Sequence, residues 1–267
     1  MEFAVLGRFQ VCSRDVADRL RRTKPKVAFA LLLANANRPV STGRFMTQLW
    51  GDRPPRSAVA NLYTYVCAIR RILPVDGTEQ RLICDAAGYT LAVADGELDA
   101  LRHWELATRA RAELRRGDPM RSAGLFAQAV RLWRGRPLAD LPANGELEQW
   151  VEYLEEQHRA VLRDWTDARL QLGLADELVG ELRGAVAADP LCERVHAQLM
   201  LALYRAGRVA EALDAFATAR QMLVDELGLD PGPSLRRIQA AMLRHDPSLV
   251  GSDPGAWLAI QSAASRP

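Results

Sequence analysis

The segment between Ser57 and Arg71 places polar side chains on one side of a predicted helix. Ser57, Asn61 and Thr64 are spaced by four and then three residues, and Ala68 continues the series. Because an α-helix repeats every 3.6 residues, these positions share one face. Hydroxyl and amide groups hydrogen-bond to base edges, and a small apolar side chain can contact a base methyl group. The segment contains no carboxylate, so its polar face is predicted to contact nucleic acid.

Basic and aromatic residues flank this face. Arg70 and Arg71 can pair with phosphate, or with guanine, to which an arginine offers two aligned donors. Other basic residues are placed to hold the DNA backbone, and Arg81 is placed to reach the minor groove. The complete predicted set of DNA-binding residues is Lys24, Lys26, Arg44, Arg56, Ser57, Asn61, Thr64, Tyr65, Ala68, Arg70, Arg71 and Arg81.

The alternative interpretation is that these residues are ordinary solvated charges. Only two of the 35 basic residues are lysines, and heavy use of arginine is typical of a GC-rich coding genome. The absence of a carboxylate favours DNA binding for the face as a whole. For each single residue, both interpretations stay open.

Three helices are predicted to position this face. Apolar periodicity after Pro25 predicts the first. The second begins near Ser41 or Thr42, either of which can cap it, and it stops before Pro54, because proline lacks an amide donor. The third runs from about Ser57 to Leu73, and its predicted core stripe is Val59, Leu62, Val66, Ile69 and Leu73.

Short strands are predicted on both sides of the helices. Residues 3–11 indicate a strand pair, and residues 81–84 and 89–93 indicate a hairpin in which Gly88 supplies a positive φ. Strands, three helices and a terminal hairpin match a winged helix-turn-helix, whose last helix enters the major groove.

The rest of the chain is predicted to be helical from residue 98 to residue 245. Gly173 and Gly207 are 34 residues apart, which is the period of tetratricopeptide helical hairpins. The predicted fold class is therefore mainly α: an N-terminal winged helix-turn-helix of α+β type, followed by an all-α, tetratricopeptide-like helical domain. Tryptophans at positions 104, 133, 150 and 165 are predicted to anchor the core.

Charge is distributed unevenly along the 267 residues. Residues 1–95 hold 14 basic and 8 acidic side chains, whereas residues 96–267 hold 21 and 25. A basic module suits DNA, and an acidic module suits a protein partner. We expect a DNA-binding domain at 1–95, a helical activator domain at 96–245 and a loose tail at 246–267.

No constellation for catalysis is visible in the sequence. Neither lysine follows a glycine, so a P-loop is excluded, and the four histidines lack metal-ligand spacing. The four cysteines have no paired spacing, which suggests reduced residues. We therefore expect a cytoplasmic non-enzyme without catalytic residues, metal, cofactor or membrane contact.

Several motifs resemble the Streptomyces antibiotic regulatory protein family of transcriptional activators. In the first 95 residues they are Val5-Leu6-Gly7, Trp50-Gly51-Asp52 with Pro54-Pro55, the run from Leu62 to Arg71, and Gly88-Tyr89. Further motifs resemble the bacterial transcriptional activator domain: Leu132-Trp133-Arg134-Gly135 with Pro137-Leu138-Ala139-Asp140, Asp189-Pro190-Leu191, His196 to Tyr204, Gly207-Arg208, Glu211-Ala212-Leu213 and Glu226 to Gly232.

This resemblance implies an OmpR-like winged-helix domain joined to an activator domain. It implies binding to direct repeats near the −35 region of promoters in secondary-metabolite (antibiotic) gene clusters, with a second copy alongside. It also implies recruitment of RNA polymerase through its sigma factor. Ala68 departs from the family, whose members often carry a longer polar side chain there, so one base contact is expected to be weakened or altered.

A second function stays open from the sequence alone. Arrays of helical hairpins also bind peptides or small molecules in a concave groove. In this alternative, the chain is a ligand-responsive regulator or adaptor whose helical domain binds a metabolite or peptide.

Overall fold

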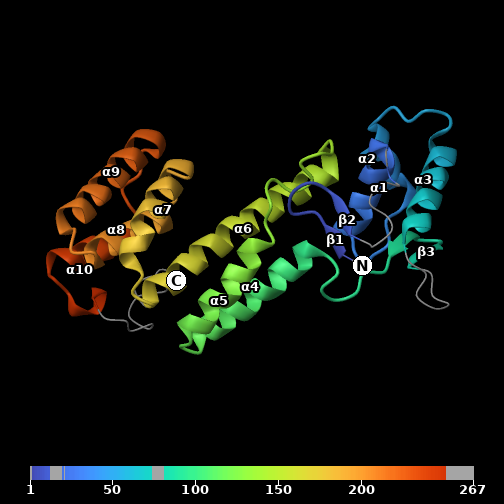
Figure 1. The fold of residues 1–267 in the computed structure, drawn as a ribbon. Helices are drawn as coiled ribbons and strands as arrows, with labels where there is room; N and C mark the ends of the chain where they lie inside the picture. Colours follow the sequence, from blue (N-terminus) through green and yellow to red (C-terminus); the bar gives the residue numbers. More distant parts are fainter. Residues whose placement is uncertain (1, 13–19, 21, 74–80, 251–267) are drawn as a thin grey trace. The chain divides into compact units, whose positions relative to one another are not determined.

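The computed structural model describes residues 2–12, 20, 22–73 and 81–250, and the chain forms two compact units. The first unit comprises residues 1–108 and 128–160, and the second comprises residues 109–127 and 161–267. Three helices, labelled in Figure 1, contribute residues to both units: α4 (Asp99–Arg115), α5 (Pro119–Arg131) and α6 (Gly145–Gln171). The predicted domain limits at residues 95 and 245 stay predictions, because the units follow contacts rather than chain order.

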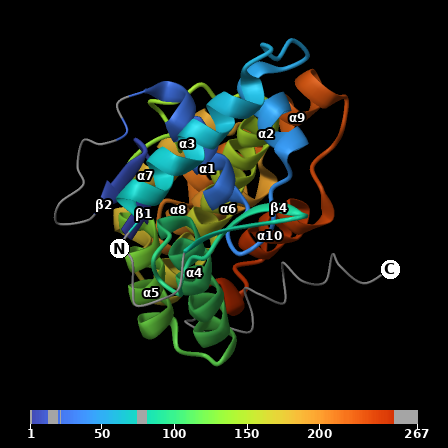
Figure 2. The ribbon, with the colours of Figure 1, turned by 90° about the vertical axis from the view of Figure 1, so that its right-hand side faces the viewer.

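The first unit contains the predicted strand pair, three helices and hairpin. The strands of each pair run antiparallel, and α3 lies across α1 (Figure 2). The elements are β1 (Glu2–Ala4), β2 (Gln10–Cys12), α1 (Thr23–Ala34), α2 (Thr42–Trp50), α3 (Ala58–Ile72), β3 (Leu82–Asp85) and β4 (Gly88–Leu91).

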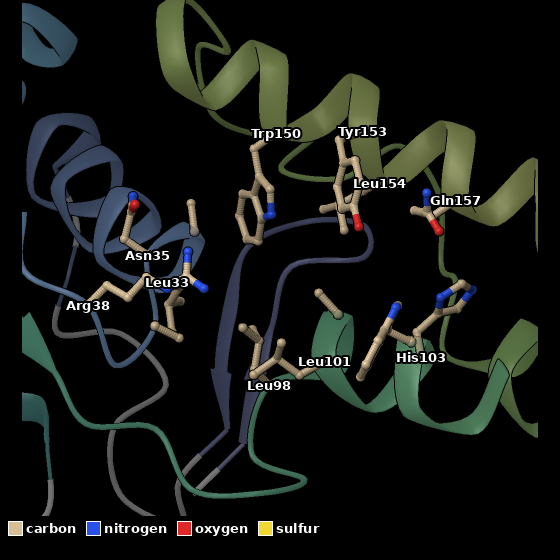
Figure 3. Close-up of a pocket in the computed structure, with 14 residues that line it drawn as sticks. Leu33, Asn35, Arg38, Leu98, Leu101, His103, Trp150, Tyr153, Leu154 and Gln157 are labelled. Atoms are coloured by element: carbon tan, nitrogen blue, oxygen red, sulfur yellow. The ribbon is translucent and has the colours of Figure 1, made fainter. Parts of the chain in front are cut away.

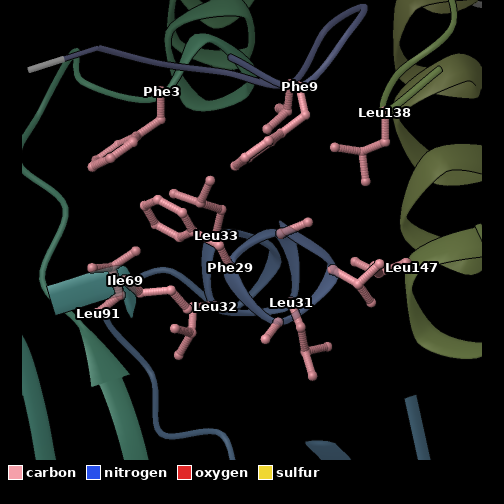
Figure 4. Packing of buried hydrophobic residues seen from close by; sticks show 14 of the residues in the cluster. Phe3, Phe9, Phe29, Leu31, Leu32, Leu33, Ile69, Leu91, Leu138 and Leu147 are labelled. Carbon is pink, nitrogen blue, oxygen red and sulfur yellow. The ribbon is translucent and has the colours of Figure 1, made fainter. Parts of the chain in front are cut away.

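Helix α1 is the centre of the first unit's core. Every residue from Val27 to Leu33 is at most 4% exposed. Phe3 and Phe9 pack edge-on against Phe29, with ring centroids 5.6 and 5.7 Å apart (Figure 4). The helix is therefore buried on all sides, not only on the single face that periodicity predicted.

The two motifs around Leu6 and Leu138 contact each other in this unit. The backbone N–H of Arg134 donates to the Leu6 carbonyl at 2.8 Å, and that of Leu138 donates to the Val5 carbonyl at 3.0 Å. The Asp99 carboxylate accepts from the backbone N–H groups of Val5, at 2.8 Å, and Leu6, at 3.1 Å. Leu138 itself is 1% exposed in the core around α1. The N-terminal motif is thus fastened to residues that follow α5.

The hairpin β3–β4 joins the loop before α2 through a close backbone approach. Tyr89 and Val40 exchange backbone hydrogen bonds of 3.0 and 2.9 Å. Gly88 has φ +134°, and a Cβ there would lie 2.1 Å from the Val40 carbonyl oxygen. The predicted positive φ is confirmed, and this position also needs glycine for space.

The predicted core stripe of α3 is wrong at its first residue. Leu62, Val66, Ile69 and Leu73 are buried, but Val59 is 66% exposed. The loop before α3 is exposed throughout and does not cover Val59. Ala58, one position earlier and four residues before Leu62, is buried instead.

The prediction that four tryptophans anchor the core is also wrong in part. Trp104 is 52% exposed, whereas Trp133 and Trp150 are half-buried and pack against the first unit's core. In the second unit Trp165 is half-buried, with the Arg169 guanidinium 4.8 Å from its ring centroid. Apolar periodicity alone does not show which side of a helix a partner covers.

The second unit contains the predicted helical hairpins. Helix α8 packs against α7, α9 and α10, and most of its residues are buried. Arg194 contacts the carboxylates of Asp164 and Asp167 at 2.6 Å each. The remaining helices here are α7 (Ala175–Ala188), α8 (Glu193–Arg205), α9 (Val209–Leu227) and α10 (Pro233–Leu243).

The predicted loose tail begins with ordered residues. Pro247–Leu249 form a 3₁₀ turn, Leu249 is 1% exposed, and its carbonyl accepts a 2.7 Å hydrogen bond from Arg205. The rest of the predicted tail, residues 251–267, lies outside the described residues.

Candidate nucleic-acid interface

Helices α2 and α3 form the two-helix motif that positions the predicted recognition face. Ser41 caps α2 by accepting a 3.4 Å hydrogen bond from the Arg44 N–H, as its residue type predicts. Glycine and two prolines end α2, and α3 starts at Ala58. Both helices pack on α1, which fixes the outward side of α3.

The outward side of α3 carries the four residues predicted to read bases, and two of them are exposed. Ser57 and Thr64 are exposed, and Asn61 and Ala68 are half-buried. The Asn61 amide donates to the Ser57 hydroxyl at 3.2 Å, and the Thr64 hydroxyl donates to the Ala60 carbonyl at 3.0 Å. These contacts hold the Asn61 and Thr64 side chains close to the helix.

Two arginines on this surface have no carboxylate partner among the described residues. Arg56 and Arg71 are exposed, and neither forms an ion pair with another residue that the structure describes. No acidic residue occurs in Ala58–Ile72. An arginine without a protein partner is available to a phosphate or a guanine.

Two further predicted residues pack around Trp50, the last residue of α2. The ring of Tyr65 stacks on that of Trp50, with centroids 6.3 Å apart. The Lys24 ammonium lies 4.7 Å from the centroid of the Trp50 ring. The three side chains join the start of α1, the end of α2 and the middle of α3. Lys24 is also exposed and can reach a ligand, whereas Tyr65 is half-buried.

Arg44 is engaged inside the first unit. Its guanidinium pairs with the Glu146 carboxylate and donates a 2.7 Å hydrogen bond to the Asn35 amide oxygen. Asn35 in turn donates to Glu146 at 2.7 Å. Burial raises the pKa of Glu146, but these hydrogen bonds outweigh it and hold the pKa below its usual value. Arg44 thereby ties α2 to the start of α6.

Three other predicted residues also have partners. The Lys26 ammonium lies 3.7 Å from the Asp140 carboxylate. The Arg70 guanidinium donates to the Leu82 carbonyl at 3.2 Å, and Arg81 pairs with Glu97. Each contact joins separate segments of the first unit. A DNA contact by Lys26, Arg44, Tyr65, Arg70 or Arg81 stays a prediction, and the structure gives each of them a positioning role.

Sequence reasoning missed part of the exposed face of α3. Val59 is 66% exposed and Tyr63 is 62% exposed, and Ala60 between them is exposed as well. Val59 and Tyr63 are four residues apart, which is the same spacing that singled out Ser57 and Asn61. Apolar groups on a recognition helix can contact thymine methyl groups.

Two histidines that appear isolated in the sequence lie side by side in the first unit. His103 Nε2 and His158 Nδ1 are 3.3 Å apart, and the indole ring of Trp133 stacks on His158 at 4.0 Å. Burial, with a smaller effect of His103, lowers the pKa of His158 to about 4. Two neutral imidazoles can share one hydrogen bond, so the pair fits a packed core.

The described part of the chain holds no cluster of three or more potential metal ligands. None of the described helices has the length and apolar character needed to cross a membrane. Cys67, Cys84 and Cys192 are free.

Comparison with known proteins gives consistent matches. Residues 98–243 match the model of the bacterial transcriptional activator domain. The chain is 36% identical over 251 residues to the regulatory protein AfsR of Streptomyces coelicolor, covering 94% of this chain and 25% of AfsR. It is 35% identical over 238 residues to the regulatory protein DnrI of Streptomyces peucetius, covering 86% of this chain and 88% of DnrI.

A solved structure shares the fold. Mycobacterium tuberculosis EmbR, in complex with a low-affinity phosphopeptide, is 28% identical and superposes with a TM-score of 0.90 over 99% of this chain and 70% of EmbR. The predicted fold class, a winged helix-turn-helix followed by a helical domain, is confirmed by this likeness.

Proposed function

Because the chain belongs to the Streptomyces antibiotic regulatory protein family of transcriptional activators, we propose that it binds promoter DNA through its first unit, with α3 as the recognition helix. The observation that carries the proposal is the outward side of α3. It exposes Arg71 and polar side chains, and α3 contains no carboxylate to repel phosphate.

The proposed contacts fall into two groups. Ser57 directly precedes α3, and Asn61, Thr64 and Ala68 lie along it, where a helix in the major groove meets base edges. Arg56, Arg71 and Lys24 are exposed and bind the phosphate backbone or guanine. The paired residues described above, such as Arg44, hold α2, α3 and the hairpin in place. Specificity then comes from the first group, and affinity that depends on salt comes from the second.

The proposed activity is activation of a secondary-metabolite gene cluster. Two copies bind direct repeats near the −35 region, and the helical part recruits RNA polymerase through its sigma factor. The family and the similarity to DnrI over most of both chains support this proposal. The chain spans only about a quarter of the length of AfsR, so no property of the remaining part of AfsR is assigned to this chain. Because its targets are DNA and polymerase, we place it in the cytoplasm and assign it no enzymatic activity.

A footprint on the promoters of the neighbouring gene cluster tests this proposal. With the full chain, we expect two protected sites in direct repeat next to the −35 region, and added RNA polymerase should extend the protection downstream. Protection without any effect on polymerase would contradict the proposed recruitment. No protection on any cluster promoter would contradict the proposed DNA target.

The second candidate function is a ligand-responsive regulator. A groove in the helical hairpins was the sequence-based expectation. A specific observation in the first unit, an apolar pocket beside α1, favours ligand binding at a different place.

A further inference from the structure

The first unit contains an open pocket whose lining residues are not among the proposed DNA-binding residues. It has a volume of about 390 Å³ and lies between the end of α1, the start of α4 and the first half of α6 (Figure 3). Leu98, Leu101 and Trp104 line it from α4 and the residue before it, and Trp150 and Tyr153 line it from α6. All of its lining residues belong to the first unit.

The size of the pocket limits what fits. An apolar cavity of about 150 Å³ accommodates one benzene molecule. A volume of about 390 Å³ therefore has room for two fused rings with a substituent, and it lies within the range of small-molecule sites.

The walls favour a flat aromatic molecule. Two indole rings and a phenol ring supply large, flat apolar surfaces on both sides of the pocket. Trp104 is 52% exposed and Tyr153 is 54% exposed, so a ligand would cover apolar surface that now faces water. Aromatic side chains gain additional stabilisation when another ring stacks on them.

A cation at one end of the pocket favours an acidic ligand. Arg38 lies at the α1 end, with Asn35 (Figure 3), and its side chain forms no ion pair with any residue in the described part of the chain. The loop that carries Arg38 is fixed, because the Asn37 side chain bonds to both the N–H and the carbonyl of Val93 at 2.9 Å. His103 and Gln157 line the other end of the pocket.

We propose that this pocket binds a planar aromatic acid of about two fused rings, with its rings between Trp104 and Trp150 and its carboxylate near Arg38. The pocket also adjoins the contacts that hold α2. Asn35 lines it and accepts the hydrogen bond from Arg44. A ligand that displaces Asn35 shifts α2 and so changes DNA binding, a consequence that rests on the proposed function.

Calorimetric titration of the full chain with 2-naphthoate, without DNA, tests the site by itself. We expect one saturable site with a Kd of about 1 mM or tighter, as for a ligand of this size. The neutral 2-naphthylmethanol should bind about two- to fivefold more weakly, because Arg38 is exposed and its attraction is screened. Equal binding of acid and alcohol would overturn the acid assignment.

Variants locate the site. Leu101→Trp fills the pocket and should lower 2-naphthoate affinity at least about tenfold, while Trp104→Ala removes one wall and should lower it about three- to tenfold. Leu101 and Trp104 are partly exposed, so both variants should fold, which thermal melting checks. Arg38→Gln should abolish the preference for the acid, and Arg115→Gln, at an exposed arginine outside the pocket, should keep it.

Unchanged affinity in Leu101→Trp and Trp104→Ala, or no binding by the unmodified chain, would overturn the proposal. A promoter-shift assay with and without 2-naphthoate then tests the coupling to α2. Saturable binding with no effect on the shift leaves the pocket assigned and refutes the coupling alone. If the chain binds no promoter DNA with or without 2-naphthoate, the proposed function is contradicted and the pocket assignment is unaffected.

Discussion

Replacing Leu138 tests whether residues after α5 are part of the core around the DNA-binding helices. Leu138 is 1% exposed and belongs to the same cluster as Phe29 and Leu31. Leu138→Ala leaves a cavity, and a fully buried leucine replaced by alanine costs about 2–5 kcal/mol. We expect the free energy of opening of α1 to fall by that amount.

The backbone at Leu138 sharpens the prediction. Its φ is +53°, a left-handed conformation that costs a non-glycine residue about 1 kcal/mol or more. Leu138→Gly removes the same contacts but relieves this strain. Glycine elsewhere is less stable than alanine, yet here Leu138→Gly should be at least as stable as Leu138→Ala.

Hydrogen exchange followed by mass spectrometry measures these effects at the α1 amides of Val27–Leu33. The control is Leu229→Ala, because Leu229 is 61% exposed and belongs to the second unit. It should change the free energy of opening of α1 by no more than about 0.5 kcal/mol. Unchanged protection of α1 in Leu138→Ala would refute the shared core. A glycine variant clearly less stable than the alanine variant would refute the strain at this position.

Two further changes probe the hairpin and the histidine pair. Gly88→Val should destabilise the first unit by at least about 2 kcal/mol in urea unfolding, since its Cβ would collide with the Val40 carbonyl; wild-type stability would mean the close approach is absent. Burial lowers the pKa of His158 to about 4, so between pH 6.5 and pH 4 the unfolded chain takes up a proton that the folded chain does not. The contribution of the neutral His158 imidazole to folding stability is complete above pH 6.5 and is lost as the pH falls toward 4. Because His158 is only partly buried, we expect the free energy of unfolding to fall by about 2 kcal/mol over this interval. This is about half of what the whole pKa shift would give. The His158→Gln variant should lose less stability than wild type between pH 6.5 and pH 4. If the two proteins lose stability in parallel over this interval, His158 is not the group responsible.

Local patterns predicted most of the elements. Helix periodicity and capping placed α2 and α3 to within a residue or two, and Gly88 placed the hairpin. These signals are local, because a cap or a turn depends on neighbouring residues. The burial of α1 on all sides was not predicted, since an apolar run does not show how many partners will cover it.

Long-range pairing explains what sequence reasoning missed at the candidate site. Arg44 looks like a free cation in the sequence, but Glu146, which lies 102 residues later, neutralises it in the fold. His103 and His158 are 55 residues apart and become neighbours. The spacing of Val59 fits the core stripe, but its side chain is 66% exposed while that of Ala58 beside it is buried. Each case depends on which segments meet, and that information is absent from local spacing.

The salt dependence of promoter binding by Arg71→Ala tests the central claim most directly. Arg71 is exposed on α3 without an ion-pair partner among the described residues, so its removal should leave thermal stability unchanged. If α3 binds DNA, Arg71→Ala should weaken promoter binding about five- to tenfold and lower the slope of log affinity against log salt by about one, as expected for one lost phosphate contact. Arg115→Ala, outside α3, should change neither. Equal affinity and equal slope for wild type and Arg71→Ala would contradict DNA recognition by α3.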